Sequence, residues 1–148
     1  MATADRRAEV RWDGALVSGS GSVTLISSGG GTFPVTWPSR VEKADGRTSP
    51  EELLAAAHAS CFAMSFSAIL GREAAHPERL DVSATVSLNP KEGGGFKVTD
   101  SALTVSGVVP GVDQATFAEL AEKAKDGCPM SGALAGNVKL SVSATLIQ

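Results

Sequence analysis

Two thiols are the strongest nucleophiles in this sequence, and Cys61 and Cys128 are its only cysteines. A thiol reacts as its thiolate, so the pKa of each cysteine decides whether it does chemistry. Buried cysteines are more often inert small hydrophobic residues than catalysts. The surroundings of each thiol must therefore show what would ionise it. Arg40, Glu51 and His58 are the side chains considered for that role.

Cys128 lies between two helix signals. Gly127 directly precedes it and is typical of a helix end, whereas Pro129 directly follows it and fits the first position of a new helix. The sequence therefore predicts Cys128 at a helix N-cap. Helix N-termini favour negative charge and lower the pKa of a cysteine.

Cys61 has no such help, because it lies about twelve residues into a predicted helix and the dipole acts only on the first turn. Burial there raises its pKa above the free value of roughly 8.5. A pKa below 7 would need a shift of more than one and a half units, upward of about 2 kcal/mol. Only a cation held close to the sulfur can supply this, so a reactive Cys61 requires an arginine.

Arg40 is the best-placed arginine, because it lies in a connection before the helix and follows Trp37 and Pro38. Arg47 and Arg72 are alternatives nearer the helix ends. For any single arginine, a solvated loop position is the commoner role.

Glu51 is free to orient the arginine by a charge-assisted pair, because Glu52 can complete the capping box with Ser49. Its other role would be an interaction with the helix N-terminus. Glu51 and Cys61 are ten residues apart, about 15 Å along a helix axis. If both belong to one site, we expect the glutamate to come from a second chain, with the two helices antiparallel across a dimer.

His58 lies one helical turn before Cys61, and the two share a face. A cysteine–histidine hydrolase would need the imidazole aimed at the sulfur and a third group that orients it. Side chains on one helix point along it, so a packed or hydrogen-bonded core histidine is favoured. Cys61, Cys128 and His58 lack paired ligand spacing, so no metal site is expected, and no C-x-x-C exchange motif is present.

The helix that carries Cys61 is predicted over residues 48–70. Ser49 fits the N-cap and Pro50 the first helical position. No face of it is hydrophilic, which is typical of a buried helix. Its many alanines would let a second helix approach closely, either the helix at residues 113–126 or its own copy in a dimer.

The rest of the chain alternates between strands and helices. Alternating apolar and polar residues predict strands at 8–12, 21–26, 82–88 and 138–146, and a long strand at 96–109 with an irregularity near Asp100. Residues 34–46 read as a connection, residues 113–126 as a second helix and residues 129–136 as a short helical turn. The pattern predicts one α+β domain over residues 1–148, in which strongly curved antiparallel sheets wrap central helices.

Composition indicates a cytoplasmic globular protein. The net charge of −3 gives no general attraction to nucleic acid or to an anionic membrane. The first twenty residues are charged and lack the apolar stretch of a secretory signal. The apolar run at residues 53–70 is at the short end for a membrane span and is diluted by alanine and serine, so a core helix is favoured.

Two motifs resemble the OsmC/Ohr family, the osmotically inducible and organic hydroperoxide resistance proteins. They are residues 48–64, TSPEELLAAAHASCFAM, and residues 124–131, AKDGCPMS. Residues 12–14 (WDG) and 108–113 (VVPGVD) are similar to the OsmC branch, and the resemblance covers essentially the whole chain.

The resemblance implies a thiol peroxidase that forms an intertwined homodimer with its active sites at the dimer interface. It makes Cys61 the peroxidatic cysteine and Cys128 the resolving one, with Arg40 and Glu51 as the activating pair. The implied partners are an organic hydroperoxide or hydrogen peroxide and an external dithiol reductant, for which a lipoylated protein is one candidate. No other cofactor is implied.

Apolar side chains near Cys61 would suit organic hydroperoxides, and the expected walls are Leu54, Phe62, Met64, Phe66 and Met130. Two alternatives remain open. One is an OsmC-shaped dimer of low peroxidase activity that binds apolar small molecules, and the other is a cysteine hydrolase that uses Cys61 and His58.

Overall fold

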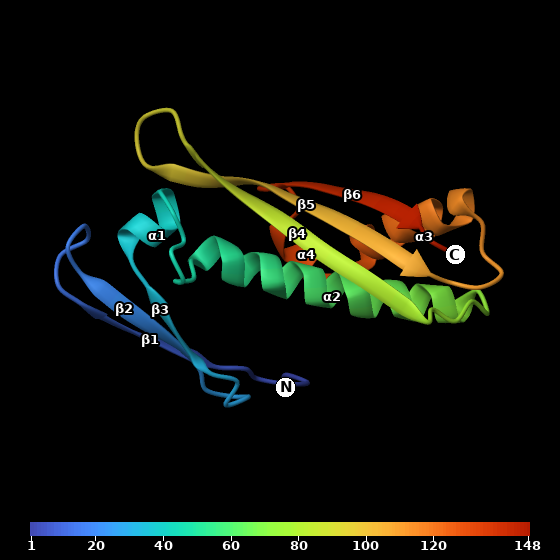
Figure 1. Ribbon diagram of the computed structural model, residues 1–148, viewed down its shortest axis with the longest axis horizontal. Helices are drawn as coiled ribbons and strands as arrows, with labels where there is room; N and C mark the ends of the chain where they lie inside the picture. Colours follow the sequence, from blue (N-terminus) through green and yellow to red (C-terminus); the bar gives the residue numbers. More distant parts are fainter. The chain divides into compact units, whose positions relative to one another are not determined.

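The computed structural model describes residues 1–148, and the chain forms two compact units, residues 1–53 and residues 54–148. Figure 1 labels the elements of both. The chain forms two small sheets, whose strand pairs are mostly antiparallel, together with helices, which confirms the predicted α+β class. Each unit is described by itself below.

The first unit is built on a three-stranded antiparallel sheet in the order β1-β2-β3. Its strands are β1 (Ala8–Asp13), β2 (Ser20–Leu25) and β3 (Thr32–Val35). The first two confirm the predicted strands. Gly14 has φ +94° in the turn after β1, a conformation that glycine adopts without strain.

A short helix, α1 (Trp37–Val41), follows β3 and carries Arg40 in its last turn. Thr36 caps it, since its side chain accepts from the Ser39 backbone N–H and the Ser39 hydroxyl accepts from the Thr36 N–H. The prediction of a plain connection at residues 34–46 is therefore wrong. A helix of five residues is too short to show periodicity in the sequence, so only its capping residues could have indicated that a helix begins here.

The long helix α2 (Pro50–Arg72) begins as predicted after Ser49, whose hydroxyl accepts from the Glu52 backbone N–H at 3.2 Å. The capping box differs in one bond. The Glu52 carboxylate accepts from the Thr48 hydroxyl at 2.5 Å instead of reaching the Ser49 N–H. Glu51 stays free of the cap, as expected.

In the second unit, α2 buries a line of side chains spaced four residues apart: His58, Phe62, Phe66 and Leu70. The expectation of a helix buried all round is wrong for the single chain, because Ser60, Met64 and Ser67 are exposed. By length and composition alone α2 is apolar enough to cross a membrane. Its buried line nevertheless belongs to a protein core, and core helices pass the same test.

A second three-stranded sheet has the order β4-β5-β6, from β4 (Arg79–Pro90), β5 (Phe96–Val108) and β6 (Lys139–Leu146). The β4–β5 register shifts between Ser87 and Leu88, opposite Asp100, which confirms the predicted irregularity. The β5–β6 pair is parallel, not antiparallel as expected. The helices between β5 and β6 carry the chain back to the starting edge, and such a crossover makes the strands parallel.

Those helices are α3 (Gln114–Gly127) and α4 (Pro129–Leu134). Asp113 caps α3 and accepts from the Thr116 backbone N–H at 2.7 Å. Cys128 separates the two helices in an extended conformation and is the N-cap residue of α4, as predicted.

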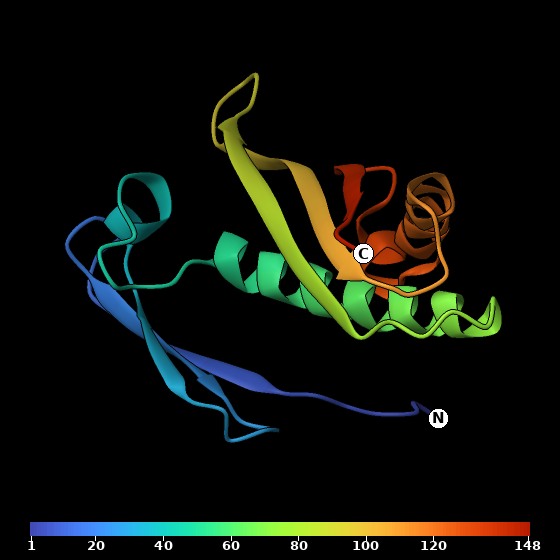
Figure 2. The same ribbon diagram turned by 45° about the vertical axis from the view of Figure 1, so that its right-hand side comes forward.

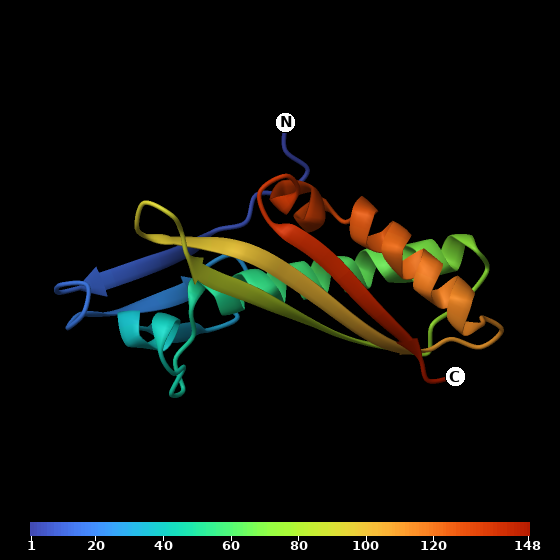
Figure 3. The same cartoon turned by 90° about the horizontal axis from the view of Figure 1, so that it is seen from above.

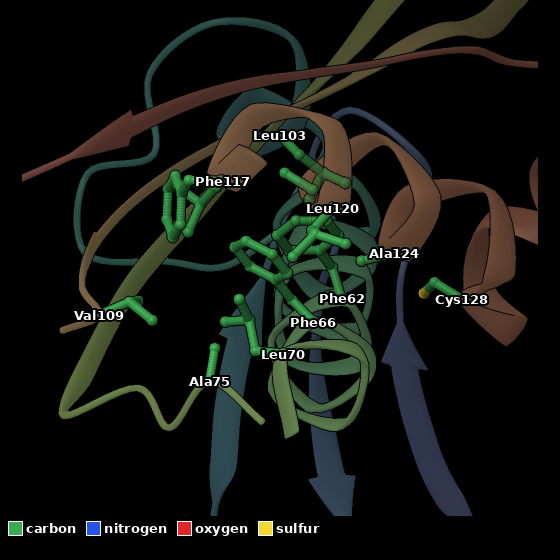
Figure 4. Close-up of a cluster of buried hydrophobic side chains, with 12 residues drawn as sticks. Phe62, Phe66, Leu70, Ala75, Leu103, Val109, Phe117, Leu120, Ala124 and Cys128 are labelled. Carbon is green, nitrogen blue, oxygen red and sulfur yellow. The ribbon is translucent and has the colours of Figure 1, made fainter. Parts of the chain in front are cut away.

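The core of the second unit lies where α2, α3 and β5 meet, and Figure 4 shows its side chains. Phe66 is central, with ring centroids 5.5 Å from Phe62 and 5.0 Å from Phe117 of α3. Figures 2 and 3 show α2 and α3 on the same face of the β4-β5-β6 sheet. The predicted helix of the same chain therefore does pack against α2, whereas Ser60, Met64 and Ser67 of α2 are exposed.

Candidate active site: paired thiols and an arginine–glutamate pair

The sulfurs of Cys61 and Cys128 lie 2.9 Å apart within the second unit, and both cysteines are free thiols. Cys61 comes from the middle of α2 and is half-buried, whereas Cys128 comes from the start of α4 and is fully buried. A disulfide requires sulfurs that can approach to bonding distance with little backbone movement. This pair meets the requirement.

The two thiols differ in acidity because their surroundings differ. Burial alone would raise the pKa of Cys128, but donors that face its sulfur outweigh it and lower the pKa: the Cys61 thiol, the backbone N–H groups of Ser131 and Met130, and the Ser131 hydroxyl. These contacts do not have the geometry of a standard capping hydrogen bond. They still place the positive end of α4 at the sulfur.

The pKa of Cys61 is raised, first by burial and then by its hydrogen bond with Cys128. The Met130 backbone N–H and the Ser65 hydroxyl lower it less than these effects raise it. The direction agrees with the reasoning that a thiol in mid-helix cannot ionise unaided. The hydrogen bond between the two thiols therefore accompanies a raised pKa at Cys61 and a lowered pKa at Cys128.

Arg40 and Glu51 form a two-pronged ion pair in the first unit. Arg40 Nε donates to both Glu51 carboxylate oxygens at 3.0 and 3.1 Å, and Nη2 donates to Oε1 at 2.8 Å. The Glu51 side chain is only 10% exposed and that of Arg40 33%. A charge-assisted fork of this kind fixes the guanidinium in one orientation. Trp37 adds to it, with its ring centroid 5.9 Å from the Arg40 guanidinium carbon.

An apolar hollow of about 630 Å³ lies beside this ion pair in the first unit. Arg40 is the only charged residue on its wall, which is otherwise apolar apart from Thr36. The remaining lining residues are Ala8, Val10, Trp12, Leu16, Val23, Val35, Trp37, Pro50 and Leu53. Such a space suits a ligand with an apolar body and one polar end.

His58 is fully buried, and both of its ring nitrogens are engaged. Nδ1 lies 2.6 Å from the Ser101 hydroxyl, and Nε2 lies 2.9 Å from the Ser131 hydroxyl. This confirms the prediction of a hydrogen-bonded core histidine. No ring nitrogen remains to take a proton from Cys61, so the structure does not support the hydrolase alternative.

The five expected substrate-contacting residues divide into two groups. Phe62 and Phe66 have no exposed surface and belong to the core, so their expected role as pocket walls is wrong for this chain. Their positions follow from the four-residue spacing that turns them toward Phe117. Met64 and Met130 are exposed and Leu54 is half-buried, so these three can still face a ligand.

Several functional candidates were missed from the sequence. Ser131 had a local signal, since it lies three residues after Cys128 in the first turn of α4. Ser101 had none, because it meets His58 only through a contact spanning 43 residues. Val10 and Trp12 were placed on a strand, but their exposure beside Arg40 could not be foreseen. No three His, Cys, Asp or Glu residues gather into a group that could hold a metal ion.

An α+β protein with two facing free thiols, one of them at a helix N-terminus, belongs to the class of dithiol proteins. Comparison of the sequence narrows this to one family. A model of the OsmC family, described as OsmC-like protein, matches residues 43–143, and the chain therefore belongs to that family.

Relatives and solved structures agree with this assignment. Peroxiredoxin OsmC of Escherichia coli is 38% identical over 138 residues, which cover 93% of this chain and 95% of that protein. An organic hydroperoxide resistance protein of Xanthomonas axonopodis is 30% identical over 65% of this chain and 66% of its own length. The structure of OhrB from Bacillus subtilis superimposes with a TM-score of 0.75 at 27% identity, covering 94% of this chain and 98% of that one.

Proposed function

We propose that this protein is a thiol-dependent peroxidase that reduces organic hydroperoxides, and hydrogen peroxide as well, with Cys61 as the peroxidatic and Cys128 as the resolving cysteine. The observation that carries the proposal is the approach of the two free sulfurs to 2.9 Å. Membership of the OsmC family supports it, because relatives bear the names peroxiredoxin and organic hydroperoxide resistance protein.

The reaction has three steps. The Cys61 thiolate attacks the distal oxygen of the hydroperoxide, the O–O bond breaks, and the departing alkoxide takes a proton and leaves as an alcohol. Cys61 is then a sulfenic acid. Cys128 attacks its sulfur, an S–S bond forms, the S–O bond breaks and water leaves. An external dithiol, for which a lipoylated protein is our candidate, reduces the disulfide by thiol exchange.

Activation of Cys61 requires a cation, since burial and Cys128 together raise its pKa. We assign this role to Arg40, held in one orientation by Glu51. Glu51 lies in the first turn of α2, ten residues and about 15 Å along the axis from Cys61. The Arg40–Glu51 pair of one chain would therefore serve Cys61 of a second chain in a homodimer. The uncovered apolar side of α2, which includes Met64, supports such a partner.

The substrate class follows from the surfaces near the reacting groups. Leu54, Met64 and Met130 would form apolar walls around the thiols. The hollow in the first unit puts a single guanidinium among apolar side chains. An organic hydroperoxide has a matching form, with one polar peroxide end and an apolar body. The protein would act in the cytoplasm, where a dithiol reductant keeps the pair in use.

The same hollow favours one second candidate, a dimer of low peroxidase activity that binds apolar small molecules. A single experiment separates the two. The reduced protein is mixed with one equivalent of cumene hydroperoxide, and its free thiols are counted. Loss of both thiols, abolished in Cys61→Ser, is the expected result for a peroxidase. Untouched thiols in the wild-type protein would overturn the proposal in favour of the binder.

A further inference from the structure

A buried chain of three hydrogen-bonding side chains ends at the resolving cysteine. His58 of α2 lies between the hydroxyls of Ser101 on β5 and Ser131 on α4, at 2.6 and 2.9 Å. All three residues are at most 2% exposed, and no buried polar side-chain atom of the protein lacks a partner. The peroxidase mechanism above uses none of the three.

The imidazole in this chain is neutral, because burial lowers the pKa of His58 and no carboxylate pairs with it. A neutral imidazole has one N–H donor and one lone pair. A serine hydroxyl has one hydrogen to give and can accept as well. The chain of hydrogen bonds therefore runs in one of two directions, and the tautomer of His58 decides which.

The direction matters for Cys128. Ser131 lies in the first turn of α4, three residues after Cys128, and its hydroxyl is among the groups that lower the pKa of Cys128. When the Ser101 hydroxyl donates to Nδ1 and Nε2–H donates to the Ser131 oxygen, the Ser131 hydrogen is left for the sulfur. In the opposite direction Ser131 gives its hydrogen to Nε2, and the sulfur receives none.

We propose that His58 is a positioning residue for the resolving cysteine: it holds Ser131 so that this hydroxyl donates to the Cys128 sulfur while that sulfur attacks oxidised Cys61. The inference rests on the proposed function for the attack itself. The hydrogen bonds that it invokes lie entirely within the second unit and involve no partner chain. A single hydroxyl thereby links the α2 helix that carries Cys61 to the acidity of Cys128.

The step that this hydrogen bond favours is the formation of the disulfide, which proceeds as follows. Cys128 ionises and its proton passes to solvent. The thiolate attacks the sulfur of the Cys61 sulfenic acid, the S–S bond forms, and the S–O bond breaks. Hydroxide leaves and takes one proton from solvent to become water. Donation from Ser131 favours the thiolate that starts this sequence.

The other titratable groups near Cys128 do not replace this donor. On α2 the neighbour is Cys61, whose sulfur lies at hydrogen-bonding distance, 2.9 Å, from that of Cys128. At the end of α3, Lys125 is held by Glu122 at 2.8 Å and by Asp126 at 3.6 Å. On α4, Met130 and Ser131 contribute backbone N–H groups, and Ser131 adds the only side-chain hydroxyl that lowers the pKa of Cys128.

The first test measures Cys128 alone, in a Cys61→Ser background shared by every variant. The rate of iodoacetamide alkylation is followed from pH 5 to pH 10, which gives the apparent pKa of the thiol. Ser131→Ala and His58→Leu should each lower the alkylation rate at pH 7 about fivefold to tenfold, the effect of one lost hydrogen bond. His58→Gln should stay near the parent, because its amide N–H lies where Nε2–H lies and still donates to Ser131.

Control variants distinguish the hydrogen-bonding role of His58 and Ser131 from a general effect on core packing. Ser143→Ala removes an exposed hydroxyl from β6 of the same unit and should leave the profile unchanged. Circular dichroism checks that each variant is folded. If His58→Leu does not fold, Ser131→Ala decides the matter, because it deletes one hydroxyl and introduces no bulk. An unchanged profile in Ser131→Ala, or an equal loss in His58→Gln and His58→Leu, would overturn the proposal.

The second test follows the reaction with both cysteines present. After one equivalent of cumene hydroperoxide, quenched samples are analysed for sulfenic acid and for disulfide. Ser131→Ala should form sulfenic acid at the parent rate and disulfide several-fold more slowly. A parent protein that forms neither species would contradict the peroxidase function, while the alkylation profile would still decide the role of His58. Equal rates of disulfide formation in parent and variant would count against His58.

Discussion

The two units of this chain differ in what they do with their large apolar side chains. The second unit buries them in one core, where Phe62, Phe66 and Phe117 have no exposed surface. In the first unit only Val23 and Val35 are buried hydrophobic residues, whereas Val10 is 63% and Leu16 57% exposed. A three-stranded sheet that buries so little is not stable by itself. The first unit therefore leaves large apolar side chains exposed.

The candidate active-site residues are also divided between the two units. The second unit holds both thiols but raises the pKa of Cys61, the thiol that we propose attacks the peroxide. The first unit holds an arginine fixed by a buried glutamate, beside an apolar hollow. In the mechanism that we propose, the nucleophile is therefore held by a buried core, whereas its activating cation lies on a surface with exposed apolar side chains. The following predictions test this contrast, beginning with the largest effect.

Removal of one aromatic ring from the core of the second unit should greatly lower the free energy of unfolding. Phe66→Ala deletes the side chain that joins α2 to α3, and we expect a loss of about 3–5 kcal/mol in the free energy of unfolding. Val10→Ala in the first unit should cost about 0.5 kcal/mol or less at low protein concentration, as for an exposed residue. Urea unfolding measures both. Equal losses would show that the two units do not differ in packing.

Removal of the cation should act on reactivity and not on the core. Arg40→Gln removes the positive charge, although the amide can still donate a hydrogen bond to Glu51. Because no cation then stabilises the Cys61 thiolate, the pKa of Cys61 should stay high. The rate of oxidation by cumene hydroperoxide at pH 7 should fall about thirtyfold or more, the effect of one and a half pKa units. Arg79→Gln, which breaks an exposed ion pair with Asp81 in the second unit, is the matched control. An unchanged rate in Arg40→Gln would mean that another arginine activates Cys61.

Loss of the negative charge of Glu51 should also lower the peroxidase activity, but by less than loss of the Arg40 cation. Glu51→Gln keeps the shape of the side chain and one acceptor oxygen, but the guanidinium is no longer fixed by a charged fork. A hydrogen bond to a charged group contributes about 1.5 kcal/mol at the low end of its range, so a drop of roughly tenfold in kcat/KM is expected. Steady-state assays with cumene hydroperoxide measure it. A variant as active as the parent would remove Glu51 from the mechanism.

The smallest effect concerns pH. Burial lowers the pKa of His58 from its usual 6.5, so the unfolded chain binds a proton that the folded chain does not. The folded state is therefore favoured above pH 6.5, and this contribution is lost as the pH falls through that value toward the lowered pKa. The parent should lose more stability between pH 7.5 and pH 5 than His58→Gln does. Parallel unfolding curves over that range would contradict a neutral, buried imidazole.

Much of the second unit could be predicted from local patterns. Strand alternation, the Asp113 cap and the position of Cys128 between Gly127 and Pro129 all have short-range causes. The parallel pairing of β5 with β6 could not, because alternation shows which face is buried but not the direction of the neighbouring strand. The partners of His58 could not either, since Ser131 lies 73 residues away along the chain.

The first unit was harder to predict. Five residues of α1 show no periodicity, so Arg40 was expected in a loop although it lies in a capped helix. The apolar nature of α2 indicated a cover on all sides, but composition does not show whether the cover belongs to the same chain. The pairing of Arg40 with Glu51 was proposed from chemistry alone, and the structure has it within one chain.

One measurement tests most directly whether the cation of one chain activates the thiol of another. Two variants, Cys61→Ser, which is expected to be inactive, and Arg40→Gln, which is expected to be strongly impaired, are given different affinity tags and co-expressed, and the heterodimer is purified. One of its two sites then combines an intact Cys61 with an intact Arg40 from the other chain. The account predicts about half of the parent peroxidase activity per dimer. A heterodimer as inactive as either variant alone would contradict it, because Arg40 would then serve the cysteine of its own chain.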